Sequence, residues 1–193
     1  VVIFKTAIGQ VKKGKMKFPV NILFDECSER SYVTEAFVKE NKLKSRGSEY
    51  IDIVGFGGHV TTCKVEKIPI VFTSKGKQVE IEALMKRKIV EPLDQTNWAK
   101  CKSFEHIEGL NLANQFETEK FEVEVMVGLD FAYEFLQEAV VTNEVGPRAQ
   151  LSIYGFIPCG PLYPSMYKDS DKNKGGNAEV VTYFCKTQTL FTS

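Results

Sequence analysis

Apolar and polar residues alternate along most of this chain, which is the pattern of strands that bury one face. The ranges that carry strand character are Val1 to Gln10, Met16 to Phe24, Tyr50 to Val54, Val60 to Thr73, Gln78 to Met85, Phe121 to Val127, Ala139 to Thr142, Gln150 to Ile157 and Glu179 to Phe191. Turn-forming residues separate several of them, as at Lys12-Lys13-Gly14-Lys15 and Ser74-Lys75-Gly76-Lys77. On the strand Phe121 to Val127, we expect Val123, Val125 and Val127 to share one face.

Two segments have the spacing of short helices. Tyr32 to Leu43 is amphipathic and follows Ser31, a plausible N-cap, and Asp130 to Leu136 begins with its own possible cap. Glu91 to Phe116 is irregular and predicts loops with one helical turn, while Tyr163 to Asn177 reads as a polar surface loop. We therefore expect a mainly-β domain over residues 1–162, with residues 163–193 as a loop and β extension on the same domain.

Composition excludes several classes of protein. Hydrophobic residues make up 43% of the 193 and charged residues 26%, which is ordinary for a globular domain. The 25 basic residues balance 25 acidic ones, so no overall field favours direct binding of nucleic acid. No apolar run reaches the length of a membrane span, so no membrane association is expected. Because the chain begins with Val1, we expect it to be a piece of a longer protein.

The metal-binding residue types are scattered. The five cysteines (Cys27, Cys63, Cys101, Cys159 and Cys185) form no CxxC pair, and His59 and His106 lie far from each other. The sequence therefore predicts no metal site, no cofactor and reduced thiols, as in the cytoplasm. Cys63 and Cys159 lie in strand-like runs and are expected to be small core residues.

One acidic residue comes directly after a hydrophobic strand. In Asn21-Ile22-Leu23-Phe24-Asp25-Glu26-Cys27-Ser28, an apolar run delivers Asp25 to a short polar turn. A carboxylate on a rigid strand end can serve as a general acid or base if it faces a second one. The plainer alternative, that Asp25 only ends a strand or caps the next element, stays open on these residues alone.

A glycine-rich segment comes next, at Gly55-Phe56-Gly57-Gly58. Glycines at a hairpin tip permit positive φ and let the tip bend, which suits a flap that closes over a ligand. A phosphate-binding loop is disfavoured, because no helix comes after it and no Lys-Ser/Thr ends the motif. An ordinary glycine-rich hairpin is the structural alternative. His59 beside it is expected to be incidental.

The third feature is Val125-Met126-Val127-Gly128-Leu129-Asp130, an apolar strand that ends in glycine. By itself it indicates only a strand, a turn and a helix. Its significance lies in the order along the chain, which is an Asp turn, then a glycine hairpin, then an apolar strand with Gly.

In this order the chain resembles a retropepsin, and over residues 10–162 it resembles the aspartic peptidase of Bel/Pao retroelements. The matching segments are Leu23 to Val33 (with Asp25, Ser28 and Ser31), Gly109-Leu110-Asn111-Leu112-Ala113-Asn114, Val127-Gly128-Leu129-Asp130-Phe131, Gly146-Pro147-Arg148-Ala149-Gln150, and Tyr154-Gly155-Phe156-Ile157 with Gly160 after it, where the family usually has Gly-Trp. The resemblance implies a retropepsin-like closed β-barrel with one or two short helices and a glycine-rich flap hairpin.

The resemblance also implies an activity. Two Asp25 carboxylates, one from each copy of a homodimer, would share a proton and activate water against a peptide bond. The flap residues Gly55, Phe56, Gly57 and Gly58 would close over an extended peptide or polyprotein substrate, and Val127, Gly128 and Asp130 would support the Asp25 loop. Asp94 is a poor candidate for a second carboxylate, because no apolar strand precedes it. Such a domain would act in the cytoplasm, in a retroelement particle.

The chain departs from the family beside the carboxylate. The family has Ser or Thr and then Gly after its Asp, whereas this chain has Glu26 and Cys27. The hydroxyl would lock two loops across the dimer and the Gly would allow their close approach. Ser28 could supply a hydroxyl from a shifted position. Two hypotheses result, an active aspartic endopeptidase or an inactive peptidase fold that serves as a dimerisation or peptide-binding module. Trp98 has no assigned role.

Overall fold

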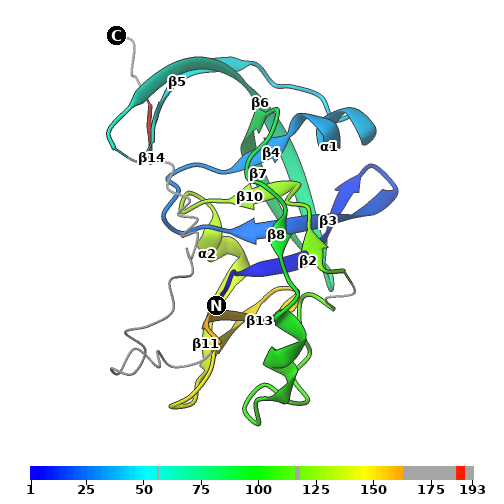
Figure 1. Cartoon of the computed structure of the whole chain (residues 1–193). Coiled ribbons are helices and arrows are strands. Elements are labelled where there is room, and N and C mark those ends of the chain that lie inside the picture. The colour runs from blue at the N-terminus through cyan, green and yellow to red at the C-terminus, as the bar shows by residue number, and fades with distance from the viewer. Residues whose placement is uncertain (56, 116–117, 163–185, 190–193) are drawn as a thin grey trace.

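The computed structural model of the chain describes residues 1–55, 57–115, 118–162 and 186–189, and strands dominate it (Figure 1). The strands are β1 (Val2–Ile3), β2 (Thr6–Lys13), β3 (Met16–Phe24), β4 (Tyr32–Thr34), β5 (Ser48–Val54), β6 (Val60–Ser74), β7 (Lys77–Lys86), β8 (Leu93–Asp94), β9 (Lys120–Phe121), β10 (Val125–Val127), β11 (Leu136–Val141), β12 (Arg148–Ser152), β13 (Gly155–Pro161) and β14 (Lys186–Thr189). The helices are α1 (Glu35–Glu40), the 3₁₀ helix η1 (Trp98–Ser103) and α2 (Ala132–Phe135). Strand makes up 50% and helix 10%, so the mainly-β prediction is confirmed.

Six strands close into a barrel in the order β6-β2-β3-β10-β4-β7, and pairing of β6 with β7 completes the ring. The β3–β10 and β4–β7 pairs are parallel, while the other neighbours are antiparallel. Ala7, Val11 and Ile22 are fully buried in the main core. Closure removes the free edges that an open sheet would expose. The predicted closed barrel is confirmed, and its form is consistent with a retropepsin-like barrel.

A smaller sheet, in the order β1-β13-β12-β11, lies against one end of the barrel (Figure 1). The amide of Ile153 donates to the carbonyl of Phe135 at 3.0 Å, and Ser74 donates its hydroxyl to the carbonyl of Ile153 at 2.5 Å. Phe135 also meets Phe72 edge-to-face, with ring centroids 5.1 Å apart. These contacts tie the small sheet and α2 to the barrel core.

The irregular stretch between β8 and β9 packs on this small sheet. Trp98 is 2% exposed and lies in a third apolar cluster with Cys101 and Ile107, so its role is structural. The predicted helical turn in this stretch is confirmed as η1.

The same stretch is joined to the small sheet by its backbone. Phe156 donates its amide to the carbonyl of Asn111 at 2.8 Å, and Ala113 donates to the carbonyl of Phe156 at 2.9 Å. A Cβ on Gly155 would lie 2.5 Å from the carbonyl oxygen of Asn111. The two backbone segments can therefore approach this closely only because Gly155 has no side chain. A Cβ on Gly146 would similarly lie 2.5 Å from the ring of Phe104.

The first helix is shorter than predicted. Residues 32–34 form β4, because Tyr32 and Val33 are needed as barrel residues paired with Met126 and Val125. Helix α1 begins only at Glu35, and its N-cap is Thr34, whose hydroxyl accepts from the amide of Phe37 at 3.3 Å. The prediction that Ser31 caps this helix is therefore wrong.

Three further element predictions need correction. The strand expected over 121–127 is split into β9 and β10, so Val123 packs in a different cluster from Val125 and Val127. Helix α2 has Phe131 at its N-cap position with no side-chain cap, so Asp130 does not cap it. The strand expected over 150–157 is a hairpin of β12 and β13, in which Ser152 pairs with Gly155.

Several predictions fall on residues that the structure leaves undescribed. They are Phe56, the surface loop at 163–177 and most of the strand expected over 179–191. Within the last of these, residues 186–189 are described and pair as β14 with β5, antiparallel.

Candidate functional site

Strand β3 carries Asp25 to the edge of the barrel and fixes its backbone there. Ile22 and Phe24 point into the main core. The amide of Phe24 donates to the carbonyl of Lys5 at 2.9 Å, and the amide of Asp25 donates to the carbonyl of Val127 at 3.0 Å. Asp25 is therefore held from both sides, by the segment before β2 and by the end of β10.

The Asp25 carboxyl is partly buried and hydrogen-bonded within its own turn. The amide of Cys27 donates to its Oδ1 at 3.1 Å, and the side chain of Ser28 also bonds to it. Burial raises the pKa of Asp25, the Glu26 charge raises it further, and the Cys27 and Ser28 hydrogen bonds oppose the rise. Ser28, which is fully buried, thus supplies a hydroxyl to the acid of its own chain.

The two residues that replace the usual hydroxyl and glycine have distinct surroundings. Glu26 forms an ion pair with Lys5, and the side chains of the pair are one third or less exposed. Cys27 is exposed and unpaired. The Glu26 carboxylate is therefore compensated inside the chain.

Strand β10 lies parallel to β3 and supports the Asp25 turn through Gly128. Leu23 pairs with Met126, and Phe24 pairs with Val127. A Cβ on Gly128 would lie 2.5 Å from the carbonyl oxygen of Arg30 and 2.7 Å from that of Ser28. The two loops approach so closely that only glycine fits at this position.

A polar network joins the same two loops. Ser31 donates its hydroxyl to Oδ1 of Asp130 at 2.6 Å and its amide to Oδ2 at 3.0 Å, and Gly128 donates its amide to the Ser31 hydroxyl at 3.0 Å. Burial raises the pKa of Asp130, while the bonds from Ser31 and the charge of Arg30 oppose this. Arg30 Nε lies 3.8 Å from Asp130.

The glycine hairpin is built as predicted in its described part. Strands β5 and β6 pair from Ser48 opposite Glu66 to Val54 opposite Val60. At the tip, Gly55 donates its amide to the carbonyl of His59 at 2.9 Å, and Gly57 and Gly58 both have positive φ (88° and 80°). Figure 1 shows this hairpin as a long arm that leaves the barrel.

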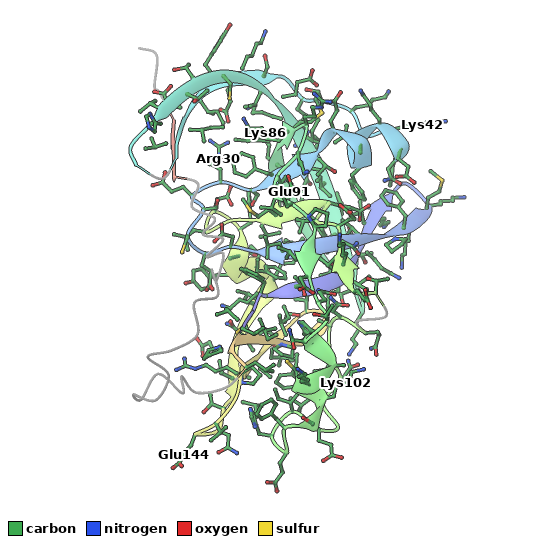
Figure 2. All side chains as sticks on the ribbon, in the orientation of Figure 1. Arg30, Lys42, Lys86, Glu91, Lys102 and Glu144 are labelled. Carbon is green, nitrogen blue, oxygen red and sulfur yellow. The ribbon has the colours of Figure 1, made fainter. Side chains whose placement is uncertain are left out.

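An ion pair ties the arm to the Asp25 loop. Arg30 Nη2 lies 2.6 Å from Glu49 Oε1, and both side chains are at most one quarter exposed. Arg30 is drawn below the arm in Figure 2. Through Arg30, the arm, the turn after β3 and the loop after β10 share one network.

The apolar surface beside Asp25 is packed against other parts of the chain. Leu23 and Met126 are 6% and 4% exposed and belong to the second core cluster. This cluster also contains Ile51 of the arm, and Phe121 and Val123 of the segment between β7 and β10. Partly buried apolar side chains, namely Ile53, Cys63, Ile89 and Val90, border it.

The structure thus brings Asp25, Ser28, Gly128 and Asp130 together, with the hairpin of Gly55, Gly57 and Gly58 joined to them through Glu49 rather than directly. Asp94 is exposed, accepts from the amide of Thr96 at 2.9 Å, and is no part of this group. Sequence reasoning missed four members, which are Lys5, Arg30, Glu49 and the Ser31 hydroxyl. Ser31 gave a signal as a residue of the matching segment Leu23 to Val33, but its local surroundings were interpreted as those of a helix cap, and the predicted β2–β3 hairpin could have placed Lys5 near the end of β3.

Within the residues described, no group of three or more His, Cys, Asp or Glu side chains is arranged to hold a metal ion. No helix in that part of the chain has the length and apolar character of a membrane span. Comparisons of the chain with protein-family models, with curated proteins and with solved structures found no match.

Proposed function

We propose that this chain is an aspartic endopeptidase domain of the retropepsin type, similar to that of Bel/Pao retroelements, and that it acts as a homodimer. The observation that carries the proposal is the placement of Asp25. It stands at the end of a barrel strand, in a turn held by Gly128 and by the Ser31–Asp130 pair, and its pKa is raised by burial. A rigid, partly buried carboxyl is what shared-proton acid-base chemistry requires.

In the proposed mechanism, each copy contributes one Asp25. Two carboxyls at contact distance do not both ionise readily, so the pair titrates in coupled steps and holds one proton between them. The ionised partner accepts a proton from water as the water attacks the peptide carbonyl, and the protonated partner donates to the carbonyl oxygen, which gives a tetrahedral diol. The carboxyl that took the water proton then gives it to the amide nitrogen while the other takes a proton from a diol hydroxyl, so the C–N bond breaks and an amine and a carboxylic acid leave. The Ser28 bond and the Cys27 amide hold each carboxyl in place during the transfer.

The proposed substrate is an extended segment of a polyprotein. An extended peptide pairs with a strand by backbone hydrogen bonds, and the β5–β6 arm, with its glycine tip, is the element that would close over it. Four cysteines in the described part of the chain are free, in keeping with action in a reducing cytoplasm.

A second function has specific support. The pair Glu26-Cys27 replaces hydroxyl and glycine, and the apolar surface at Leu23 and Met126 is already covered by the chain's own segment between β7 and β10. Both observations favour loss of activity, and the second hypothesis is then an inactive fold that serves as a dimerisation or peptide-binding module through another surface.

The deciding experiment compares wild type with Asp25→Asn on peptide pools at mildly acidic pH, with the mass in solution measured in parallel. Cleavage by wild type alone, from a dimer, supports the peptidase. Equal cleavage by both proteins removes Asp25 from the mechanism. A monomer without cleavage favours the binding module, and activity that appears only in Glu26→Ser with Cys27→Gly identifies the chain as a decayed enzyme.

A further inference from the structure

We propose that Lys5 is a positioning residue of the Asp25 site, which acts by holding and neutralising Glu26 so that two Asp25 turns can meet. This inference rests on the proposed homodimer for its consequence, but the Lys5–Glu26 contact belongs to the single chain. Lys5 lies 21 residues before Glu26 and touches no substrate in this role.

The backbone brings Lys5 to the site. The carbonyl of Lys5 accepts from the amide of Phe24 at 2.9 Å, and immediately after it Thr6 pairs with Leu23 as β2 begins. The Lys5 side chain is 20% exposed and the Glu26 side chain 33%. A partly buried pair is screened less by water and salt than an exposed pair between two mobile side chains.

Distinct partners hold the two adjacent carboxylates. Asp25 is engaged by the Cys27 amide and by Ser28, whereas Glu26 is engaged by Lys5. Cys159 of β13 lies near enough to the ion pair that, beside the burial that raises the pKa of its thiol, the charges of Lys5, Glu26 and Arg148 act on that pKa. For Asp25 itself, Glu26 is the charged neighbour that raises its pKa.

The pair has a consequence for assembly. If two Asp25 turns meet across a two-fold axis, each Glu26 stands next to the acid of its own copy and close to that of the other. Without Lys5, four carboxylates would gather at the axis, and an uncompensated buried charge strongly opposes association. With Lys5, each copy brings one compensated Glu26 and one Asp25.

The test is a double-mutant cycle in which the pKa of Asp25 is measured in the monomer. The Asp25 carboxyl is titrated by carbon-13 NMR at a concentration at which the protein is monomeric, in wild type, Lys5→Met, Glu26→Gln and the double variant. We expect Lys5→Met to raise the pKa of Asp25, Glu26→Gln to lower it, and the double variant to cancel the rise. Lys5→Arg keeps the wild-type titration. An Asp25 titration that Lys5→Met leaves unchanged overturns the proposal.

Sedimentation of the same proteins measures self-association and so tests the proposed role of Lys5 in assembly. Lys5→Met should weaken self-association on the order of tenfold, and Glu26→Gln in the same chain should restore it. Lys39→Met, which removes the Lys39–Glu35 pair on α1, is the matched control and should change neither reading. Equal association of all variants refutes the role in assembly. If wild type itself stays monomeric, the homodimer fails, while the titration still decides whether Lys5 governs Glu26 and Asp25.

Discussion

The hydroxyl of Ser31 and the carboxylate of Asp130 lie 2.6 Å apart, and this contact joins the loop after β3 to the loop after β10. Ser31 is fully buried, and its hydroxyl oxygen also accepts a hydrogen bond from the amide of Gly128. The same oxygen therefore bonds to two residues of the loop after β10. Replacing Ser31 by alanine would take away the acceptor of the Gly128 amide and one of the hydrogen bonds to Asp130, which keeps the bond from the Ser31 amide. We expect Ser31→Ala to lower the free energy of unfolding by about 1–3 kcal/mol.

Urea denaturation checks this value. The control is Ser103→Ala, because Ser103 is exposed and only bonds the carbonyl of Lys100 within its own 3₁₀ helix. We expect the control to stay within about 0.5 kcal/mol of wild type. A Ser31→Ala protein as stable as the control would mean that water replaces the hydroxyl.

Gly128→Ala tests the close approach of the two loops. The new Cβ would lie 2.5 Å from the carbonyl oxygen of Arg30, which is backbone and cannot swing away. Overpacking of this kind costs roughly 1–3 kcal/mol, and the Asp25 turn must shift to relieve it. Gly55→Ala is the control, since its Cβ would lie 3.9 Å from the nearest atom and Gly55 has no positive φ. Thermal unfolding of the two variants should separate them clearly, and equal melting temperatures would contradict the prediction.

Three carboxyls should each contribute less to the stability of the single chain as pH rises from acidic to neutral. Burial raises the pKa values of Asp25, Glu124 and Asp130 above their ordinary values, so the folded chain binds these protons more tightly than the unfolded chain. The contribution is fully present below the unfolded pKa, near 3.8 for Asp, and is lost as pH rises through the raised folded value. Asp25→Asn removes one of these groups.

Urea unfolding of wild type and Asp25→Asn at pH 4 and pH 7, at concentrations at which the chain is monomeric, checks the sign. The variant should gain stability relative to wild type between pH 4 and pH 7. If wild type gained relative to the variant instead, the Asp25 carboxylate would be stabilised, not destabilised, by its site.

Glu49→Gln should loosen the arm at its base. The Arg30–Glu49 pair joins β5 to the Asp25 loop at 2.6 Å and is largely shielded from solvent. Loss of the pair should speed hydrogen exchange of the amides in Ser48–Val54, because local opening becomes easier. Arg46→Met breaks a similar pair with Glu80 whose side chains are 60% and 52% exposed, and should leave this exchange unchanged. Equal exchange in Glu49→Gln and wild type would exclude Arg30 as the link.

The sequence predicted those parts of the fold that depend on neighbours along the chain. The run Ile22-Leu23-Phe24 could be recognised as a strand that ends at Asp25, because a continuous apolar run before a polar turn is visible without any distant partner. Glycines at Gly57 and Gly58 indicated the hairpin tip for the same reason. The strand pattern predicted only a mainly-β domain, and the closed barrel was an expectation from the resemblance.

The wrong predictions concern residues whose role depends on a contact with a residue far away in the sequence. From their local surroundings Ser31 and Asp130 were both interpreted as helix caps, whereas each binds the other across 99 residues. The expectation that Asp130 supports the Asp25 loop came from the resemblance. Val123 was placed with Val125 and Val127 by strict alternation, but the strand breaks and Val123 enters another cluster. Lys5 was missed although the predicted hairpin carried a signal, because the register that sets Thr6 opposite Leu23, and so Lys5 beside the end of β3, was not worked out from the sequence.

The long strand β6 restricts how the arm can vary. It pairs with β5 up to Glu66 and with β7 from Lys67 onward, and Lys67 also donates its amide to the carbonyl of Gly47 at 2.9 Å where the two parts meet. An insertion of one residue within β6 would turn Ile68, Ile70 and Phe72 outward from the core. Arms of different reach are therefore compatible with this barrel only if residues are gained or lost at the tip, between Gly55 and His59, or two at a time along both strands.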